Sequence, residues 1–226
     1  MAVLVAGGTG ALGGAVVREL LAAGYDCTLT WIVDAERERA EAELGDRVKF
    51  VRADLIDPQG GAGAAVAAVD DLEAVVNLVG GFFSGPAAHE TAWEEFDRMM
   101  RLNLSPAINL ARAAIPRLLE RGAGSFVAVS ARPALRPFAG SAAYSTAKAA
   151  VLAFVKALDA DYRTKGIRAN AILPSVIDTP ANREAEPDAD HAKWVQPAEI
   201  ARVVRFLVSD DSAVTSGAAI PVYGRA

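Results

Sequence analysis

The fold is decided by residues 7–14, which read Gly7-Gly8-Thr9-Gly10-Ala11-Leu12-Gly13-Gly14. This stretch follows an apolar run of strand length, residues 2–6, and precedes apolar residues at helical spacing, residues 16–21. Glycines in such a turn let the backbone approach a pyrophosphate, and the helix that follows offers free N–H groups to it. Both the G-x-G-x-x-G and the G-x-x-G-x-x-G register fit. The stretch predicts a dinucleotide-phosphate site, and a plain strand-to-helix turn is the alternative.

The rest of the chain alternates apolar runs of strand length with longer segments of helical periodicity. This alternation is typical of a parallel sheet whose two faces are covered by crossover helices. Strands are predicted over residues 2–6, 27–32, 47–52, 73–79, 125–130, 167–173 and 218–222, and helices over residues 12–23, 36–44, 60–69, 93–120, 144–165 and 197–207. The prediction is an α/β fold, a doubly wound, Rossmann-type, seven-stranded parallel sheet in a three-layer α/β/α sandwich. We expect one domain over residues 1–226, with a polar substrate flap around residues 175–196.

Charge and composition exclude several classes of function. The chain has 226 residues and a formal net charge of −5, with lysines and arginines scattered along it. Nucleic-acid binding needs a concentrated cationic surface, so we expect a small-molecule substrate and no nucleic acid. One cysteine, Cys27, and two histidines, His89 and His191, form no cluster with metal-ligand spacing, so no metal is predicted.

Hydrophobic segments and small residues indicate where the protein acts and how it assembles. No apolar stretch reaches the roughly 18 residues of a spanning helix, and Met1 is not followed by a basic region with a cleavage site. We therefore expect a cytoplasmic protein with no membrane partner. Small residues such as Ala149, Ala150, Ala153 and Ala157 permit close helix approach, which predicts a homodimer or a homotetramer.

A tyrosine and a lysine lie one helical turn apart in Tyr144-Ser145-Thr146-Ala147-Lys148. The i, i+4 spacing puts the phenol and the ammonium on one helix face. A nearby ammonium favours phenolate and would lower the pKa of Tyr144 from about 10, which would suit proton exchange with a substrate. Alone, the pair is more typical of an ordinary helix surface than of a catalytic site. Its position after the fifth predicted strand, beside a nucleotide turn, favours catalysis.

The residues that would contact the adenosine are less well defined. An acid that binds the ribose should end the second strand, where this chain has Trp31, and the nearby Asp34 fits a helix N-cap better. Arg37 and Arg39 are the only nearby arginines that could meet a 2′-phosphate, so the choice between NAD and NADP stays open. Asp54, after the third strand, is a candidate for the adenine edge or an ordinary turn residue.

Together these features resemble the short-chain dehydrogenase/reductase family over essentially the whole chain. The family's pattern has a glycine-rich first turn, an Asn-Asn-Ala-Gly-like element after the fourth strand, an asparagine in the following helix, a serine after the fifth strand, Tyr-x-x-x-Lys, and Pro-Gly after the sixth strand. Beyond the glycine turn, this chain supplies Asn77-Leu78-Val79-Gly80, Asn103, Tyr144, Lys148 and Pro174-Ser175.

The resemblance implies NAD or NADP as cofactor and a role for each matching residue. Tyr144 would be the proton donor, Lys148 would hold the nicotinamide ribose and lower the tyrosine's pKa, and Asn103 would anchor a water molecule for proton relay. Asp178-Thr179 would meet the nicotinamide carboxamide. The cofactor-binding residues implied are Gly7, Thr9, Gly10, Ala11, Leu12, Gly13, Trp31, Asp54, Leu55, Asn77, Gly80, Lys148, Pro174, Ile177 and Thr179.

One position departs from the family's pattern. The catalytic serine usually stands thirteen residues before the tyrosine, and that position, 144 − 13 = 131, is Ala131. The adjacent Ser130 is a substitute only if the chain kinks, because consecutive strand residues point to opposite faces. The hydroxyl that would polarise a carbonyl is therefore expected to be missing.

A narrower resemblance, to quinonoid dihydropteridine reductases, accounts for this departure. It rests on the glycine turn and on Pro174-Ser175-Val176-Ile177-Asp178-Thr179-Pro180-Ala181-Asn182-Arg183, with Pro187 and Trp194 following, and that branch also has alanine at the serine position. A structural interpretation is equally available, in which Thr179 caps a helix, Pro180 occupies its first turn and Trp194 pins the flap. Residues expected near the substrate are Phe82, Phe83, Arg132, Tyr144 and Trp194, although the two phenylalanines could merely close the pocket.

The function expected is an NAD(P)H-dependent oxidoreductase that transfers hydride to a small C=N or C=O substrate, with a quinonoid dihydropteridine as one example. One alternative is a general carbonyl reductase in which Ser130 or water replaces the missing hydroxyl. Another is a dinucleotide-binding sensor or scaffold without catalysis.

Overall fold

The computed structural model, which describes residues 1–225, has a seven-stranded sheet in which every pairing is parallel and the strand order is β3-β2-β1-β4-β5-β6-β7. The strands are β1 (Ala2–Ala6), β2 (Asp26–Trp31), β3 (Val48–Arg52), β4 (Leu72–Asn77), β5 (Gly124–Val129), β6 (Ile167–Pro174) and β7 (Ala219–Val222). The predicted doubly wound sheet is confirmed, with strand ends shifted by one or two residues. The chain winds outward from β1 in one direction and from β4 in the other, so a switch point lies between these two strands, where such sheets bind ligands.

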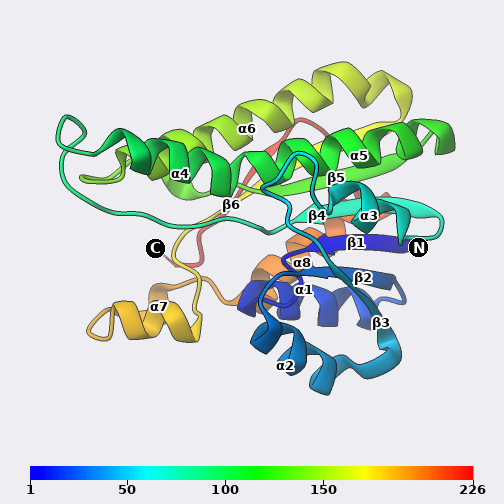
Figure 1. Ribbon diagram of the computed structural model, residues 1–226, viewed down its shortest axis with the longest axis horizontal. Helices are drawn as coiled ribbons and strands as arrows, with labels where there is room; N and C mark the ends of the chain where they lie inside the picture. Colours follow the sequence, from blue (N-terminus) through cyan, green and yellow to red (C-terminus); the bar gives the residue numbers. More distant parts are fainter. Residues whose placement is uncertain (226) are drawn as a thin grey trace.

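Helices cover both faces of the sheet, as Figure 1 shows. One face carries α1 (Ala11–Ala22), α2 (Asp34–Leu44) and α8 (Pro197–Val208). The other carries α3 (Ala62–Ala67), α5 (Ser105–Arg121) and α6 (Ala142–Tyr162), with α4 (Trp93–Asn103) packed against α6. Because both faces are covered, the central strands are apolar on successive residues, and Val75, Val76, Phe126 and Val127 are fully buried.

The helix predicted over residues 93–120 is two helices, and this part of the prediction was wrong. α4 ends at Asn103 and α5 begins at Ser105. Pro106 causes the break, because proline has no N–H to donate and its ring collides with the carbonyl four residues earlier, on Leu102. At the start of α5 the same proline is favourable, since a first-turn N–H has no helical partner. The break leaves Asn103 as the last residue of α4, next to the segment that follows β4.

The predicted flap contains regular structure. It holds α7 (Pro180–Ala185), and Thr179 caps that helix by accepting the N–H of Asn182 at 3.3 Å. A parallel bridge joins Ile177 to Val195 and ties the two ends of the segment together. Within residues 1–225, no helix has both the length and the apolarity required to cross a bilayer.

Candidate active site

The glycine turn joins the carboxyl end of β1 to α1 and depends on missing side chains. Gly7 has φ +75°, and its N–H donates to the hydroxyl of Thr30 on β2 at 3.2 Å. Gly13 packs directly on the turn, because a Cβ built there would lie 2.1 Å from the carbonyl oxygen of Gly7. The turn is therefore closed on itself, and the N-terminus of α1, capped by Gly10, has no side-chain hydrogen bond. These features leave room and free N–H groups for a pyrophosphate.

The end of β2, where the sequence analysis expects the adenosine, is cationic and aromatic. Trp31 ends β2 and is half-buried between two guanidinium groups, with the central carbons of Arg37 and Arg52 at 5.6 and 5.8 Å from its ring centroid. The hydroxyl of Thr9 donates to the carboxylate of Glu36 at 3.3 Å. No carboxylate stands at the end of β2, which is the position from which one would bind the 2′-hydroxyl of NAD.

The loop after β3 is anchored by Asn109, a residue that the sequence analysis missed. Asp54 is exposed and accepts the N–H of Ile56 at 2.9 Å, the turn role that was the alternative for it. Leu55 is buried, and its carbonyl accepts from the amide of Asn109 at 3.0 Å. Asn109 is 7% exposed on the apolar face of α5, and a lone amide among apolar positions was the signal that could have identified it.

Three predicted catalytic and binding residues meet around Gly80. A Cβ built on Gly80 would lie 2.6 Å from the Oδ1 atom of Asn103 and 2.9 Å from the Nζ atom of Lys148. Asn103 is 1% exposed, accepts the N–H of Gly81 at 3.1 Å and donates to the carbonyl of Met99 at 2.9 Å. Asn77, at the end of β4, accepts the N–H of Val79 at 3.2 Å and so shapes the chain that leads to Gly80.

Tyr144 and Lys148 lie on the first turns of α6 with their side chains on one face. The ammonium of Lys148 is 5.9 Å from the centroid of the Tyr144 ring and donates to the carbonyl of Val129 at 3.2 Å. Burial raises the pKa of Tyr144 to about 12 and lowers the pKa of Lys148 to about 8. The expected lowering of the tyrosine's pKa is therefore not seen, because desolvation outweighs the ammonium. At neutral pH the phenol keeps its proton, which is the form needed to donate one.

The serine position contributes no hydroxyl. Ala131 is 5% exposed. Ser130 is 2% exposed, and its hydroxyl donates to the carbonyl of Lys148 at 2.8 Å. This bond joins the end of β5 to α6, so Ser130 would have to break it before it could reach a substrate.

The substrate side is lined by aromatic rings. Phe82 is 62% exposed and meets the ring of Tyr144 edge-on, with centroids 5.0 Å apart. It also stacks with Phe138 at 6.4 Å, a residue that the sequence analysis missed although it lies in the loop between β5 and α6. A pocket of about 510 Å³ lies beside Phe138, lined by residues 85, 87 and 88 and by residues 137–142. Phe83 instead packs against α4, with Arg98 over its ring at 5.6 Å.

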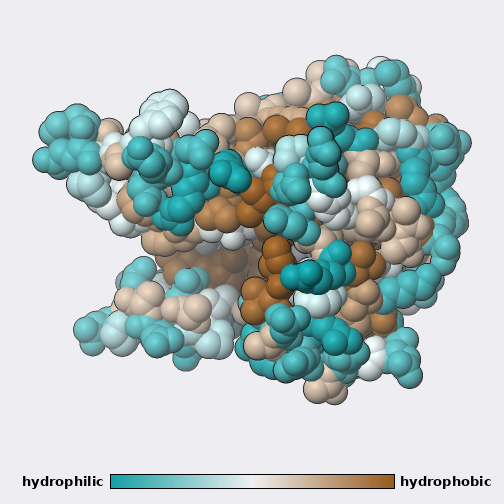
Figure 2. Space-filling model, in the orientation of Figure 1, coloured by the Kyte–Doolittle hydropathy of each residue, from teal (hydrophilic) through white to brown (hydrophobic). Residues whose placement is uncertain are grey.

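The flap closes the other side of the crevice. Asp178 is bound by Arg183 and by the amide of Gln196, and these hydrogen bonds hold its pKa well below the usual range. Trp194 is 7% exposed and packs on the ring of His191 at 4.3 Å, so it pins the flap and offers little surface to a substrate. Figure 2 shows a hollow between the α4 and α6 side of the molecule and the α7 segment, with hydrophobic residues on its floor.

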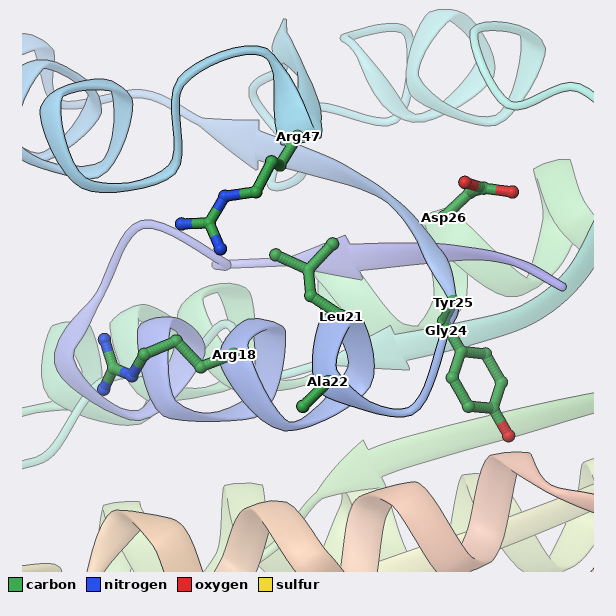
Figure 3. Close-up of a pocket in the computed structure, with 7 residues that line it drawn as sticks. All are labelled: Arg18, Leu21, Ala22, Gly24, Tyr25, Asp26 and Arg47. Atoms are coloured by element: carbon green, nitrogen blue, oxygen red, sulfur yellow. The ribbon is translucent and has the colours of Figure 1, made fainter.

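A second pocket lies away from this chemistry. It is lined by Arg18, Leu21, Ala22, Gly24, Tyr25, Asp26 and Arg47, shown in Figure 3. It opens at the start of β2 and the end of α1, the sheet edge opposite to the glycine turn. Arg18 is paired there with Glu43 at 2.7 Å. Residues 1–225 include no group of three or more His, Cys, Asp or Glu side chains that could hold a metal ion.

Lys148 is expected to make the stability of the cofactor-free protein depend on pH. Its pKa is about 8 in the folded chain and 10.5 for a fully hydrated lysine, so between these values the unfolded chain binds a proton that the folded chain does not. Lys148 alone should therefore raise the free energy of unfolding by about 1 kcal/mol from pH 8 to pH 9. Cys27 opposes part of this rise in the same interval, because its thiol, with an ordinary pKa of 9.0, ionises in the unfolded chain and stays protonated in the folded one, and Tyr144 opposes it at higher pH.

Urea unfolding at pH 8 and pH 9 measures this effect. Lys148→Met should remove the rise and stabilise the protein at pH 8. Lys156→Met, an exposed position on the same helix, should keep the wild-type slope. Equal slopes in all three proteins would show that the ammonium of Lys148 is not desolvated.

Comparisons with known proteins agree with this geometry. A family model described as Enoyl-(Acyl carrier protein) reductase matches residues 7–224. The chain is 32% identical over 242 residues to 2-(R)-hydroxypropyl-CoM dehydrogenase of Xanthobacter autotrophicus, covering 98% of this chain and 96% of the relative. A solved structure of a short chain dehydrogenase/reductase family protein is 29% identical with a TM-score of 0.91, covering 99% of this chain and 96% of that one. ElxO with NADP bound shares the fold at 22% identity and a TM-score of 0.91, covering 99% and 97%.

The matched region contains the glycine turn, Asn103, Tyr144 and Lys148, and it includes every strand after β1. The Xanthobacter dehydrogenase and the solved short chain dehydrogenase/reductase structure both align with this chain over nearly their full length. The chain is therefore an oxidoreductase that belongs to the short-chain dehydrogenase/reductase family.

Proposed function

We propose that this protein is an NAD(P)H-dependent reductase of a small carbonyl compound, with Tyr144 as the proton donor. The observation that supports the proposal most is the convergence of Asn103 and Lys148 on Gly80, beside Tyr144 and at the sheet edge that carries the glycine turn. The bound dinucleotide would supply a hydride to the carbonyl carbon. The remaining step is delivery of a proton to the oxygen, which the protonated phenol of Tyr144 would supply.

Each part of the cofactor has a matching element. The pyrophosphate fits the turn from Gly7 to Gly13, where a side chain would fill the space. Leu55, after β3, and Asn77, at the end of β4, would contact the cofactor between its adenosine and its nicotinamide, and Thr179, which caps α7, would contact the nicotinamide end. Lys148 would bind the nicotinamide ribose, and its lowered pKa lets it exchange a proton near pH 8.

A C=N substrate such as a quinonoid dihydropteridine is the second candidate, and Ala131 favours it. An electron-poor ring needs no hydroxyl to polarise it, and the only adjacent hydroxyl, on Ser130, is bonded to the carbonyl of Lys148. The flap sequence from Pro174 to Trp194 resembles that of the quinonoid dihydropteridine reductases, and this resemblance supports the same candidate. A simple ketone would instead need a water molecule or a freed Ser130.

A two-part assay tests the proposal. NADH and NADPH are titrated into the protein first, and then each is offered with a panel of aldehydes, ketones and quinonoid dihydropterin while absorbance at the nicotinamide band is followed. Oxidation of the nucleotide with a carbonyl supports the first candidate, and oxidation with the pterin alone supports the second. Tight nucleotide binding with no acceptor reduced would favour a sensor or scaffold and overturn both.

A further inference from the structure

Arg132 differs from the other half-buried arginines in residues 1–225. Four of them bind oxygen: Arg37 and Arg205 are paired with carboxylates, and Arg117 and Arg168 donate to carbonyl groups. Within those residues, Arg132 makes no ion pair and donates no hydrogen bond. A partly buried guanidinium with its donors unused loses hydration without compensation, which is costly unless a ligand completes it.

The position of Arg132 is fixed by a ring. Its guanidinium carbon lies 5.2 Å from the centroid of Tyr223, just after β7. The carbonyl of Tyr223 accepts from the hydroxyl of Ser175 at 2.7 Å, so this ring belongs to the base of the flap. Stacking on a ring holds the guanidinium plane and leaves the N–H groups at its edge free for a bidentate contact.

Arg132 also lies beside the position of the family's serine. It directly follows Ala131, at the carboxyl end of β5, in a short 3-10 helix (Arg132–Ala134) that packs against α6. The end of β5 is tied to α6 by the Ser130 and Lys148 bonds. Further along the same loop, Phe138 stacks with Phe82, which contacts Tyr144. The loop thus has a cation at its start, and further along it an aromatic ring that belongs to the cluster around the phenol.

The local charge supports an anion at this place. The chain carries a net charge of −5, yet residues 122–158 contain no aspartate or glutamate and four cations: Arg132, Arg136, Lys148 and Lys156. The absence of acids across this segment means that no carboxylate on the loop competes for the guanidinium. Within this segment no carboxylate opposes the positive charge of Arg132 and Arg136, which favours an incoming anion.

We propose that Arg132 binds an anionic group on the substrate, so that the compound reduced here is a carbonyl bearing a carboxylate or a sulfonate. This inference rests on the proposed function, because it assigns a substrate class to the same site. The aromatic wall of Phe82 and Phe138 receives the planar part of the molecule, and the guanidinium receives the charged end. When Arg132 binds the carboxylate or sulfonate, the substrate's carbonyl group is oriented toward Tyr144. This orientation compensates for the missing serine hydroxyl.

Matched substrates test the proposal with the intact protein and NADPH or NADH. 4-Carboxybenzaldehyde and 4-formylbenzenesulfonate carry the charge, and methyl 4-formylbenzoate is the neutral counterpart. Wild-type kcat/KM should be at least about 10-fold higher for the anions. Arg132→Met should lower kcat/KM for the anions by about 10- to 100-fold and leave the ester within about 3-fold. Arg136→Met, the exposed arginine on the same loop, should change neither by more than about 3-fold.

A binding measurement separates this proposal from the proposed function. 4-(Hydroxymethyl)benzoate and its methyl ester are titrated calorimetrically into the nucleotide-bound protein and into Arg132→Met. Anion binding that depends on Arg132, with no turnover of any aldehyde, would keep the anchor and overturn the reductase. Equal handling of anions and ester by wild type, unchanged in Arg132→Met, would overturn the anchor whether or not turnover occurs. Preference for the sulfonate over the carboxylate, or the reverse, identifies which oxyanion the site takes.

Discussion

Replacing Tyr144 with phenylalanine is expected to lower kcat by a factor of about 10² or more while NAD(P)H binding stays within about 2-fold. The phenol is the acidic group beside Lys148 that keeps its proton at neutral pH, since burial raises its pKa to about 12. No hydrogen bond is formed by its hydroxyl within residues 1–225, so the substitution removes the proton and leaves the packing against Phe82 in place. Steady-state rates with the best acceptor of the panel, and a nucleotide titration of the same sample, measure both quantities.

The control for this substitution is Tyr162→Phe. Tyr162 is the last residue of the same helix and packs on the core beside Lys165, far along α6 from the crevice. It should retain wild-type kcat and a similar melting temperature. Unchanged turnover in Tyr144→Phe would remove the phenol from the mechanism. A fall in nucleotide affinity equal to the fall in kcat would show that the hydroxyl serves to bind the nucleotide and not to deliver a proton.

Gly13→Ala is expected to have the largest effect on folding and cofactor binding together. The added Cβ would lie 2.1 Å from the carbonyl oxygen of Gly7 and 2.7 Å from the backbone of Gly8, so the turn itself would have to move. Forcing backbone apart at a packed contact costs about 3 kcal/mol or more by analogy with overpacked cores. Urea unfolding measures the loss, and a nucleotide titration of the folded fraction should show binding weakened by at least about 10-fold.

Gly14→Ala is the matched control, one residue further along α1. The nearest atom to a Cβ there is the flexible guanidinium nitrogen of Arg18, at 3.4 Å. Alanine favours helix by about 1 kcal/mol over glycine, so Gly14→Ala should leave stability unchanged or raise it. Similar losses in both variants would mean that helix α1, and not the closed turn, is sensitive to the added methyl group.

The sheet and the glycine turn were predictable because their signals are local. Residues 2–14 contain a strand, a turn and a helix start in one continuous segment. The successive apolar residues of the strands indicate that both faces of the sheet are buried. The break at Pro106 was also visible in the sequence, but the apolar spacing on both sides of it outweighed the proline. In the fold, the clash between the ring of Pro106 and the carbonyl of Leu102 separates α4 from α5.

Features that depend on distant partners could not be predicted in this way. The pKa of Tyr144 depends on how much water the fold removes from its ring, and the Tyr-x-x-x-Lys spacing says nothing about that. The hydroxyl of Ser130 meets the carbonyl of a residue 18 positions away, and Asn109 reaches Leu55 across 54 positions. Trp194 is a tryptophan in a polar segment, which suggests a substrate contact, but the ring of His191 covers it.

The two asparagines at the α4–α5 junction set a fixed spacing across the crevice. Asn103 holds the backbone at Gly81, and Asn109 holds the loop at Leu55, so one amide serves the catalytic end and the other the adenosine end. Asn109 follows Asn103 by six positions, with the break at Leu104 and the first turn of α5 between them. An insertion or deletion of one residue between them would rotate one amide by about 100° away from its partner. The length of residues 103–109 therefore determines the spacing between the two anchored loops. Insertions and deletions in this segment should be tolerated far less than in the loops that the two asparagines hold.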